Sequence, residues 1–582
     1  ILQAAEGNPL FLEEMLALVH DSGGREVEVP PTIQALLAAR LDQLDPAERG
    51  VLERGSVEGQ LFHSAAVVAI AREPASVDRQ LVALVRKELV RPDRSQLPAS
   101  DAYRFRHLLI RDAAYDALPK ATRAELHERF ARWLELHGSG LVELDEVLGY
   151  HLEQACRYRL ELGASADELG ARAAARLATA GRRALVVRDA ATAANLLRRA
   201  LALHEPRGRE GVELQLDLAT ALVDVGEMRE GEARRDRAVV LARETGDRAL
   251  ELRARCERAI LHTVTSPKFT GEQGLELARQ AIAELGPDGD DQALASAWFL
   301  VLAAQNLRAQ WQECIVAAEH VLEHTKSAGD RWRSEGLEFY APALFWGPTP
   351  LDEALPRVEA LLLESAHQAK SLRAWTLRPL AGFYALQGRF DEARALLAES
   401  HQILAELGRK VDLVTLAFWS GPLELLAGNP AEAARVTGEA CDFLDAAGER
   451  GWLSTMATLH ASALFDLGRF DESEAAALRS RDAATSDDAN AQASWRTALA
   501  KVLAQRGEHE EAERLVEEAL PIADSSDELN NQGYLRLDAA LVYRFAARRD
   551  KAEAALREAL ARFEQKGNAV MAGRTREFLA AL

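Results

Sequence analysis

The residue types that could do chemistry are few in this 582-residue sequence, and most of them stand alone. There is no G-x-S-x-G turn, and no cysteine has a histidine at a spacing that would indicate a nucleophile and its base. Three histidines lack the i,i+4 spacing of helical metal ligands, so we expect core or surface roles for His127, His137 and His151. The sequence therefore predicts no catalytic residue and no metal site.

One stretch gathers a histidine and three arginines: YRFRHLLIRDAAYDAL, from Tyr103 to Leu118. Its alternation up to His107 predicts a strand and its remainder predicts a helix. An imidazole at such a junction could donate a charged hydrogen bond to a phosphate, with help from Arg104, Arg106 and Arg111. The alternative is that His107 packs in the junction and the arginines form a solvated basic edge.

A second candidate is the turn Gly7-Asn8-Pro9 within AEGNPLFLEEM. Glycine and proline set the entry into an amphipathic helix, whose Glu13 and Glu14 are expected to face water. The same tripeptide recurs at 428–430 inside a repeat, so the turn alone indicates no function.

ATP hydrolysis needs a loop of the form G-x-x-x-x-G-K-[ST], whose amides, lysine and hydroxyl hold phosphates and magnesium. The sequence contains no Gly-Lys dipeptide. We therefore expect no ATPase activity, and no cofactor, in the chain as it stands. Because the chain opens at Ile1 in the middle of what looks like a module, we expect a missing N-terminal part.

The order of helices and strands expected over residues 42–120 predicts a winged-helix-like regulatory domain. Three short helices (Pro46–Val57, Phe62–Ala71 and Ser76–Val90) precede the strand YRFRH and a further helix. The 12 acidic and 12 basic side chains of this region make a poor footprint for DNA phosphates, so DNA is an unlikely partner. After it, a helical connector of three helices is expected over 121–187.

The last two-thirds of the sequence repeats itself about every 40 residues. Each copy holds two amphipathic helices around a turn. The turns predict ten copies over 188–582, at Arg188, Gly226, Phe269, Ala309, Thr349, Gly388, Gly428, Gly468, Gly507 and Arg549. Four places later the strong copies carry a carboxylate suited to a helix N-terminus, at Glu392, Glu432, Glu472, Glu511 and Glu553, followed by Ala or Ser.

Composition agrees with a mainly α-helical protein that can bury a core, with 48% hydrophobic, 28% charged and only 6% aromatic residues. No run of about 18 apolar residues predicts a membrane span. Four widely separated cysteines indicate a reduced, cytoplasmic protein, and the net charge of −21 argues against a general nucleic-acid surface.

The repeat pattern LGRFDEA resembles tetratricopeptide repeats, whose stacked hairpins form a superhelix with a concave binding face. Together with EGNPLF, VPPTIQALLAARLDQLDPAERG and YRFRHLLIRDAAYDALP, it resembles bacterial signal-transduction ATPases with numerous domains. The resemblance implies that residues 1–41 are the end of an ATPase helical lid. It also implies that Pro9 lies against the adenine and His107 near the ADP phosphate, once the missing ATPase module with ATP/ADP and Mg is present.

The function expected from this resemblance is regulatory. The repeats would bind a protein, peptide or small molecule on their concave face, and the winged helix would relay that event to the chain's own missing P-loop module. In this family such parts often follow a class III adenylate or guanylate cyclase, so the regulatory half of a cyclase is one alternative. A LuxR-type transcription regulator fragment and a stand-alone repeat scaffold are the others.

Overall fold

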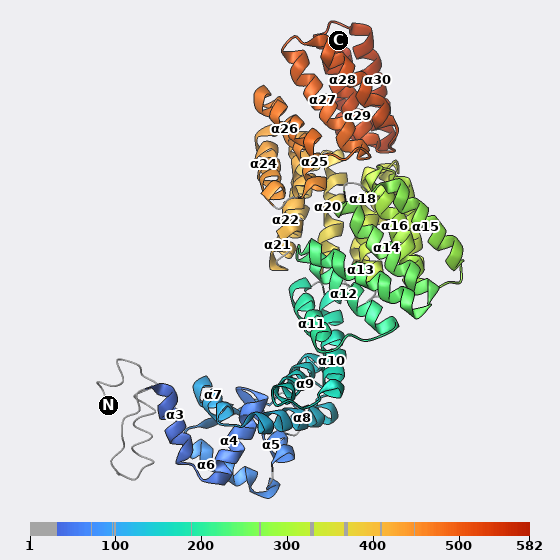
Figure 1. The fold of residues 1–582 in the computed structure, drawn as a ribbon. Helices are drawn as coiled ribbons and strands as arrows, with labels where there is room; N and C mark the ends of the chain where they lie inside the picture. Colours follow the sequence, from blue (N-terminus) through green and yellow to red (C-terminus); the bar gives the residue numbers. More distant parts are fainter. Residues whose placement is uncertain are drawn as a thin grey trace. The chain divides into compact units, whose positions relative to one another are not determined.

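The computed structural model describes residues 32–582 except 72, 96, 98–99, 188, 267–268, 326–330, 366–369, 408–409 and 447–448. The described chain is mainly helical and divides into two compact units (Figure 1). The first unit holds the residues up to Ala184 and Ala190–Ala221, and the second holds Leu185–Asp189 and Leu222–Leu582. No helix among the described residues is long and apolar enough to cross a membrane.

The first unit begins with a small α+β arrangement. Its elements are α3 (Ile33–Asp42), α4 (Pro46–Glu58), β1 (Leu61–His63), α5 (Ser64–Ile70), η1 (Pro74–Ser76), α6 (Val77–Arg86), β2 (Val90–Asp93), β3 (Ala102–Phe105) and α7 (Leu108–Asp116). The antiparallel sheet has the order β1-β3-β2, with Tyr103 of β3 between Phe62 and Pro92. Helices and hairpin thus follow the order expected for a winged helix.

Two details of this region differ from the prediction. Phe62 and His63 were expected to begin a helix, but they lie in β1, because pairing with β3 gives Phe62 a fully buried place beside Phe105. Val90 was expected to end the third helix, but it begins β2 and pairs with Phe105. The buried side chains of α4, α6 and the sheet form one apolar core.

The connector forms the three expected helices, α8 (Lys120–His137), α9 (Leu144–Glu161) and α10 (Asp167–Val186). The first unit continues with α11 (Ala190–Leu203) and the start of α12 (Arg209–Asp224). The domain limits proposed at 41, 120 and 187 stay predictions.

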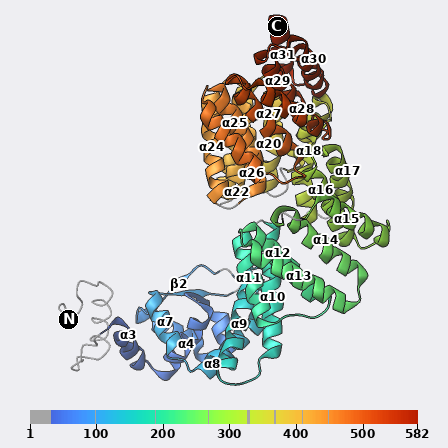
Figure 2. The same cartoon turned by 45° about the horizontal axis from the view of Figure 1, so that its top comes forward.

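The second unit is an α-solenoid of helical hairpins (Figure 2). Its helices after α12 are α13 (Met228–Thr245), α14 (Arg248–Thr265), α15 (Gly271–Leu285), α16 (Asp291–Leu307), α17 (Trp311–Glu323), α18 (Arg331–Trp346), α19 (Leu351–Ser365), α20 (Lys370–Leu386), α21 (Phe390–Glu406), α22 (Lys410–Thr415), α23 (Ala417–Leu426), α24 (Pro430–Ala446), α25 (Arg450–Asp466), α26 (Phe470–Ala483), α27 (Ala489–Gln505), α28 (His509–Asp524), α29 (Leu529–Phe545), α30 (Arg549–Lys566) and α31 (Ala569–Ala581).

Most of the described hairpin turns are closed by the same backbone device. At Gly388 the chain takes a left-handed conformation (φ 81°), which glycine adopts without a steric penalty. The next residue, Arg389, then donates its N–H to the carbonyl of Tyr384 at 2.9 Å, as in a Schellman motif. Other turns place a left-handed residue at the expected position, namely Gly226, Ala309, Gly428, Gly468 and Gly507.

The predicted register of the last hairpin is wrong by two residues. The left-handed residue there is Ala547 (φ 57°), not Arg549, and Arg548 donates to the carbonyl of Tyr543 at 2.7 Å. Glu553 therefore does not occupy the position of Glu392, which Lys551 takes instead. The prediction failed because this turn lacks the glycine that marks the other strong copies.

With this correction, the residue five places after each turn is small and buried throughout the array: Ala193, Gly231, Gly274, Cys314, Ala354, Ala393, Ala433, Ser473, Ala512 and Ala552. A small side chain at this point lets the two helices of a hairpin approach closely. The sequence motif thus fixes the spacing inside each hairpin.

The first helices of the hairpins form the inner layer of the solenoid. Successive first helices pack against one another, as α14 does on α16, α18 on α20, and α25 through α27 to α29. Ten of the 17 residues of α16 and twelve of the 17 of α20 are buried, against four of 17 in the second helix α21. Most of the exposed surface of the hairpins therefore belongs to the second helices.

The corrected register predicts that glycine substitutions at two neighbouring alanines change the free energy of unfolding in opposite directions. Ala547→Gly removes a left-handed alanine and should raise the free energy of unfolding by about 0.5 kcal/mol. Ala546→Gly is the matched control, because Ala546 is right-handed (φ −78°) at the end of α29, and it should lower that free energy by about 0.5–1 kcal/mol. Urea unfolding measures both; effects of the same sign would contradict the assigned turn.

Candidate functional site

His107 lies at the junction that the sequence predicts, two residues after the end of β3 and immediately before α7. Its backbone is extended (φ −133°, ψ 146°), and its carbonyl accepts the N–H of Ile110 at 3.1 Å. The side chain is half-buried, while the neighbouring Phe105 and Ile110 are fully buried in the core. The fold thus holds the imidazole at the first turn of α7. Pro9, the other predicted nucleotide contact, lies outside the described residues.

The three arginines near His107 form ion pairs or hydrogen bonds with other groups of the first unit. Arg104 pairs with Asp93 across the β2–β3 hairpin, and Arg106 lies 3.3 Å from Glu88. Arg111 donates to the carbonyl of Ser56 at 2.9 Å. Their charges are therefore partly neutralised by their own unit, which favours a structural role for them.

A buried polar cluster lies next to this region, and sequence reasoning did not predict it. Nδ1 of His127 lies 2.8 Å from Nδ1 of His151, and Nε2 of His127 lies 2.7 Å from the hydroxyl of Tyr115. The Tyr115 hydroxyl lies 3.0 Å from that of Tyr158. The cluster joins α7, α8 and α9. The helical phase could have revealed it, because His127 is four residues before Ala131 and His151 precedes Leu152 on buried faces.

Both histidines of this cluster are held neutral. Burial lowers the pKa of His151 to about 3 and that of His127 well below its ordinary value, and nearby Arg111 contributes in the same direction. Two Nδ1 atoms at 2.8 Å can share one proton, with one ring donating and the other accepting. No group of metal-binding side chains occurs among the described residues.

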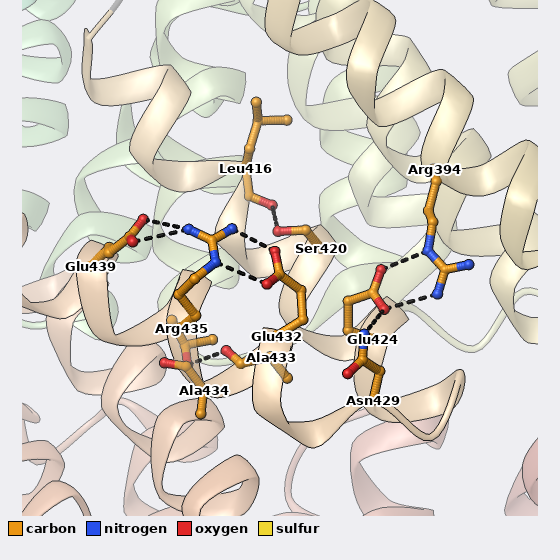
Figure 3. A network of polar contacts seen from close by, with 11 residues as sticks. Arg394, Leu416, Ser420, Glu424, Asn429, Glu432, Ala433, Ala434, Arg435 and Glu439 are labelled. Atoms are coloured by element: carbon orange, nitrogen blue, oxygen red, sulfur yellow. Dashed lines mark hydrogen bonds and ion pairs between the residues drawn. The ribbon is translucent and has the colours of Figure 1, made fainter.

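The second Gly-Asn-Pro turn shows what this tripeptide does in the array (Figure 3). Gly428 is left-handed (φ 78°), and Pro430 begins α24, where its missing N–H costs nothing. The Asn429 amide donates to Glu424 at 3.2 Å, and Arg394 of the preceding hairpin donates two hydrogen bonds to the same carboxylate at 2.8 Å. Arg394 holds the pKa of the Glu424 carboxyl below its usual range. The turn thus ties one repeat to the next.

Four of the five carboxylates predicted at the start of the second helices lie there: Glu392, Glu472 and Glu511 are exposed and Glu432 is half-buried. Glu432 accepts from Arg435 one turn later, and Arg435 also reaches Glu439 at 2.9 Å (Figure 3). Glu511 pairs with Arg514 in the same way, whereas Glu392 and Glu472 pair with the arginine three places before them. Such exposed pairs contribute little stability and keep the outer face of the repeats charged.

A family model for the tetratricopeptide repeat matches residues 452–525, which span α25 to α28. The array is therefore an α-solenoid that carries tetratricopeptide-type repeats. No curated protein matches the chain.

Solved structures with a similar fold include the Cut9–Hcn1 hetero-tetramer of APC/C, with 12% identity, 77% of this chain and 85% of that chain covered, and a TM-score of 0.44. A signal-transduction ATPase with numerous domains and a tetratricopeptide repeat sensor from Pyrococcus horikoshii matches with 13% identity, 95% and 70% coverage, and a TM-score of 0.38. A Rap protein complexed with competence and sporulation factor matches with 11% identity, 64% and 97% coverage, and a TM-score of 0.37.

The buried histidine pair predicts acid sensitivity of the first unit. The unfolded chain takes up a proton on each histidine near pH 6.5, whereas folded His151 does so only near pH 3, so stability is lost as the pH falls between these values. From pH 7 to 5 we expect a loss of about 2 kcal/mol from His151 alone. Hydrogen exchange of the α8 and α9 amides measures it.

The control is His151→Gln, which cannot titrate. The variant should be less stable at pH 7 but should show a clearly shallower dependence on pH. An unchanged dependence would contradict a neutral buried His151.

Proposed function

We propose that this chain is the sensing and relay part of a nucleotide-dependent signal-transduction switch. In this proposal the repeat array receives a protein or peptide, and the small α+β region of the first unit passes that event to a P-loop ATPase module carried by other residues. In this proposal the catalytic groups belong to that module. The match to the tetratricopeptide repeat supports the binding part of the proposal.

The observation that carries the relay is the placement of His107. It stands between the last strand of the three-stranded sheet and the first turn of α7, in the same unit as the connector α8–α10. The amides of a helix N-terminus and an adjacent imidazole together suit an anionic group such as the phosphate of ADP. Tyr115 of α7 contacts His127 of α8, the first helix of the connector. A movement of α7 would therefore also move the connector.

The physical requirement of such a switch is a difference in affinity between two states. His107 would stabilise the ADP state, and a partner on the array would favour the state in which α7 withdraws from the nucleotide. A second candidate function, a free-standing protein-binding scaffold, is favoured by the repeat match alone. It would give His107 no role in nucleotide binding.

Replacement of His107 tests the relay in the protein that includes the nucleotide-binding module. His107→Ala should release ADP about 10-fold faster or more, since a hydrogen bond to a charged group is worth about 1.5–3 kcal/mol. Arg106→Ala is the matched control: its side chain is exposed and pairs with Glu88, so ADP release should be unchanged. Stopped-flow release of a fluorescent ADP analogue measures both.

Equal ADP release from wild type and His107→Ala would remove the nucleotide role of His107 and leave the scaffold function.

A further inference from the structure

The array contacts itself across a constant offset of 216 residues. Asp487 accepts the N–H of Gly271 at the start of α15 at 3.2 Å. One repeat later, Asp527 accepts the N–H groups of Trp311 and Gln312 at the start of α17, both at 2.8 Å. These carboxylates cap the N-termini of two second helices from the loops before α27 and α29.

A third contact has the same offset but lies at the C-terminal end of a helix rather than at an N-terminus. Gly567 lies 216 residues after Leu351, and a Cβ there would lie 3.0 Å from that of Leu351. Its neighbour Lys566 is fully buried and donates to the carbonyls of Leu344, Gly347 and Thr349 at 3.0, 2.7 and 2.8 Å, at the C-terminal end of α18. We call the contacts of Asp487, Asp527 and Lys566 the seam. It joins successive turns of the superhelix, between five and six repeats apart.

The two ends of the seam differ in chemistry. At the Lys566 end, Phe563 and Met571 join the same apolar core as α18, α20 and α23. At the Asp487 and Asp527 end, most buried apolar side chains of α27 to α29 belong to other cores, and only Tyr534 and Leu537 of α29 pack at the edge of this one. The hydrogen bonds of the carboxylates therefore supply much of the contact with α15 and α17. Figures 1 and 2 agree in placing α27 to α29 beside the helices around α18.

A buried acid sits at the polar end. Glu528 accepts from the indole N–H of Trp311 at 3.3 Å and from the amide of Asn490 at 2.5 Å, and it is 6% exposed. The charged groups that face it are Asp527 on its own loop and Lys566 on α30. Burial raises the pKa of the Glu528 carboxyl to about 7, with Asp527 adding to the shift and Lys566 opposing it.

We propose that the seam is a reversible clasp, which opens at Asp487, Asp527 and Glu528 while the apolar end around Phe563 stays closed. Water can replace the polar contacts of the seam at little cost in free energy. Separation of the apolar contacts around Phe563 would expose apolar surface to water and would cost much more. The inference rests on the proposed sensing function, to which it adds two states of the array. Because the first helices are largely buried, a partner of the inner layer needs such an opening.

Opening should depend on pH in a defined direction. A carboxyl with a raised pKa in the closed seam binds its proton there more tightly than in the open one, so a rise in pH favours opening. Between pH 5.5 and 8 the open population should grow on the order of tenfold through Glu528. Glu528→Gln keeps a hydrogen-bond acceptor for Trp311 and should weaken the dependence, leaving the part due to Asp527, whose pKa burial also raises.

The experiment is hydrogen exchange on the full chain, without nucleotide or partner, followed as protection factors of the Trp311 and Gln312 amides. In wild type these should fall about tenfold from pH 5.5 to 8, and in Glu528→Gln the fall should be clearly smaller. Amides in the middle of α25, away from the seam, should keep their protection in both. Asp527→Ala should lower protection at 311–312 at every pH.

The clasp is overturned if protection at 311–312 changes in parallel with that of α25, since the seam would then open only when the array unfolds. A wild-type series with no change in protection would also overturn it. Because no nucleotide is involved, the result is independent of the ADP-release test of His107.

Discussion

The structure of the array depends on the close approach of two helices at every hairpin turn. A small buried residue after each turn lets the helices touch, and at most of the described turns a left-handed residue five places before it reverses the chain, as with Ala393 and Gly388. Because hairpins of similar geometry stack on one another, the array winds into a superhelix. The constant offset of 216 residues between Gly271 and Asp487, and between Trp311 and Asp527, follows from that regularity.

The same winding decides which surface a partner can reach. First helices pack on one another and bury most of their residues, while the second helices carry exposed arginine–carboxylate pairs such as Arg435 with Glu432. A solenoid is commonly described by an open concave face. Here polar groups of one turn cap helix ends of another, so successive turns of the array meet at the seam. In the proposed clasp, opening of the seam sets the access of a partner to the array.

Much of this fold could be predicted from sequence, because local patterns encode helices and turns. The repeat period, the connector helices and the strand–helix junction at His107 were all predicted correctly. The last turn was misplaced because Ala547 adopts a conformation usually marked by glycine. The His127–His151 pair was missed because it joins two helices. The seam could not be predicted, since a small error in rotation per repeat accumulates over five repeats. The nucleotide role of His107 and Pro9 stays a prediction.

The most direct test of the account is photo-crosslinking from a benzophenone side chain at Gln312, an exposed residue at the seam. The closed superhelix predicts an intramolecular link to the loop around Asp527, 215 residues away in sequence. Links confined to α16, α17 and α18, or links between chains, would show that successive turns do not meet and would contradict the account.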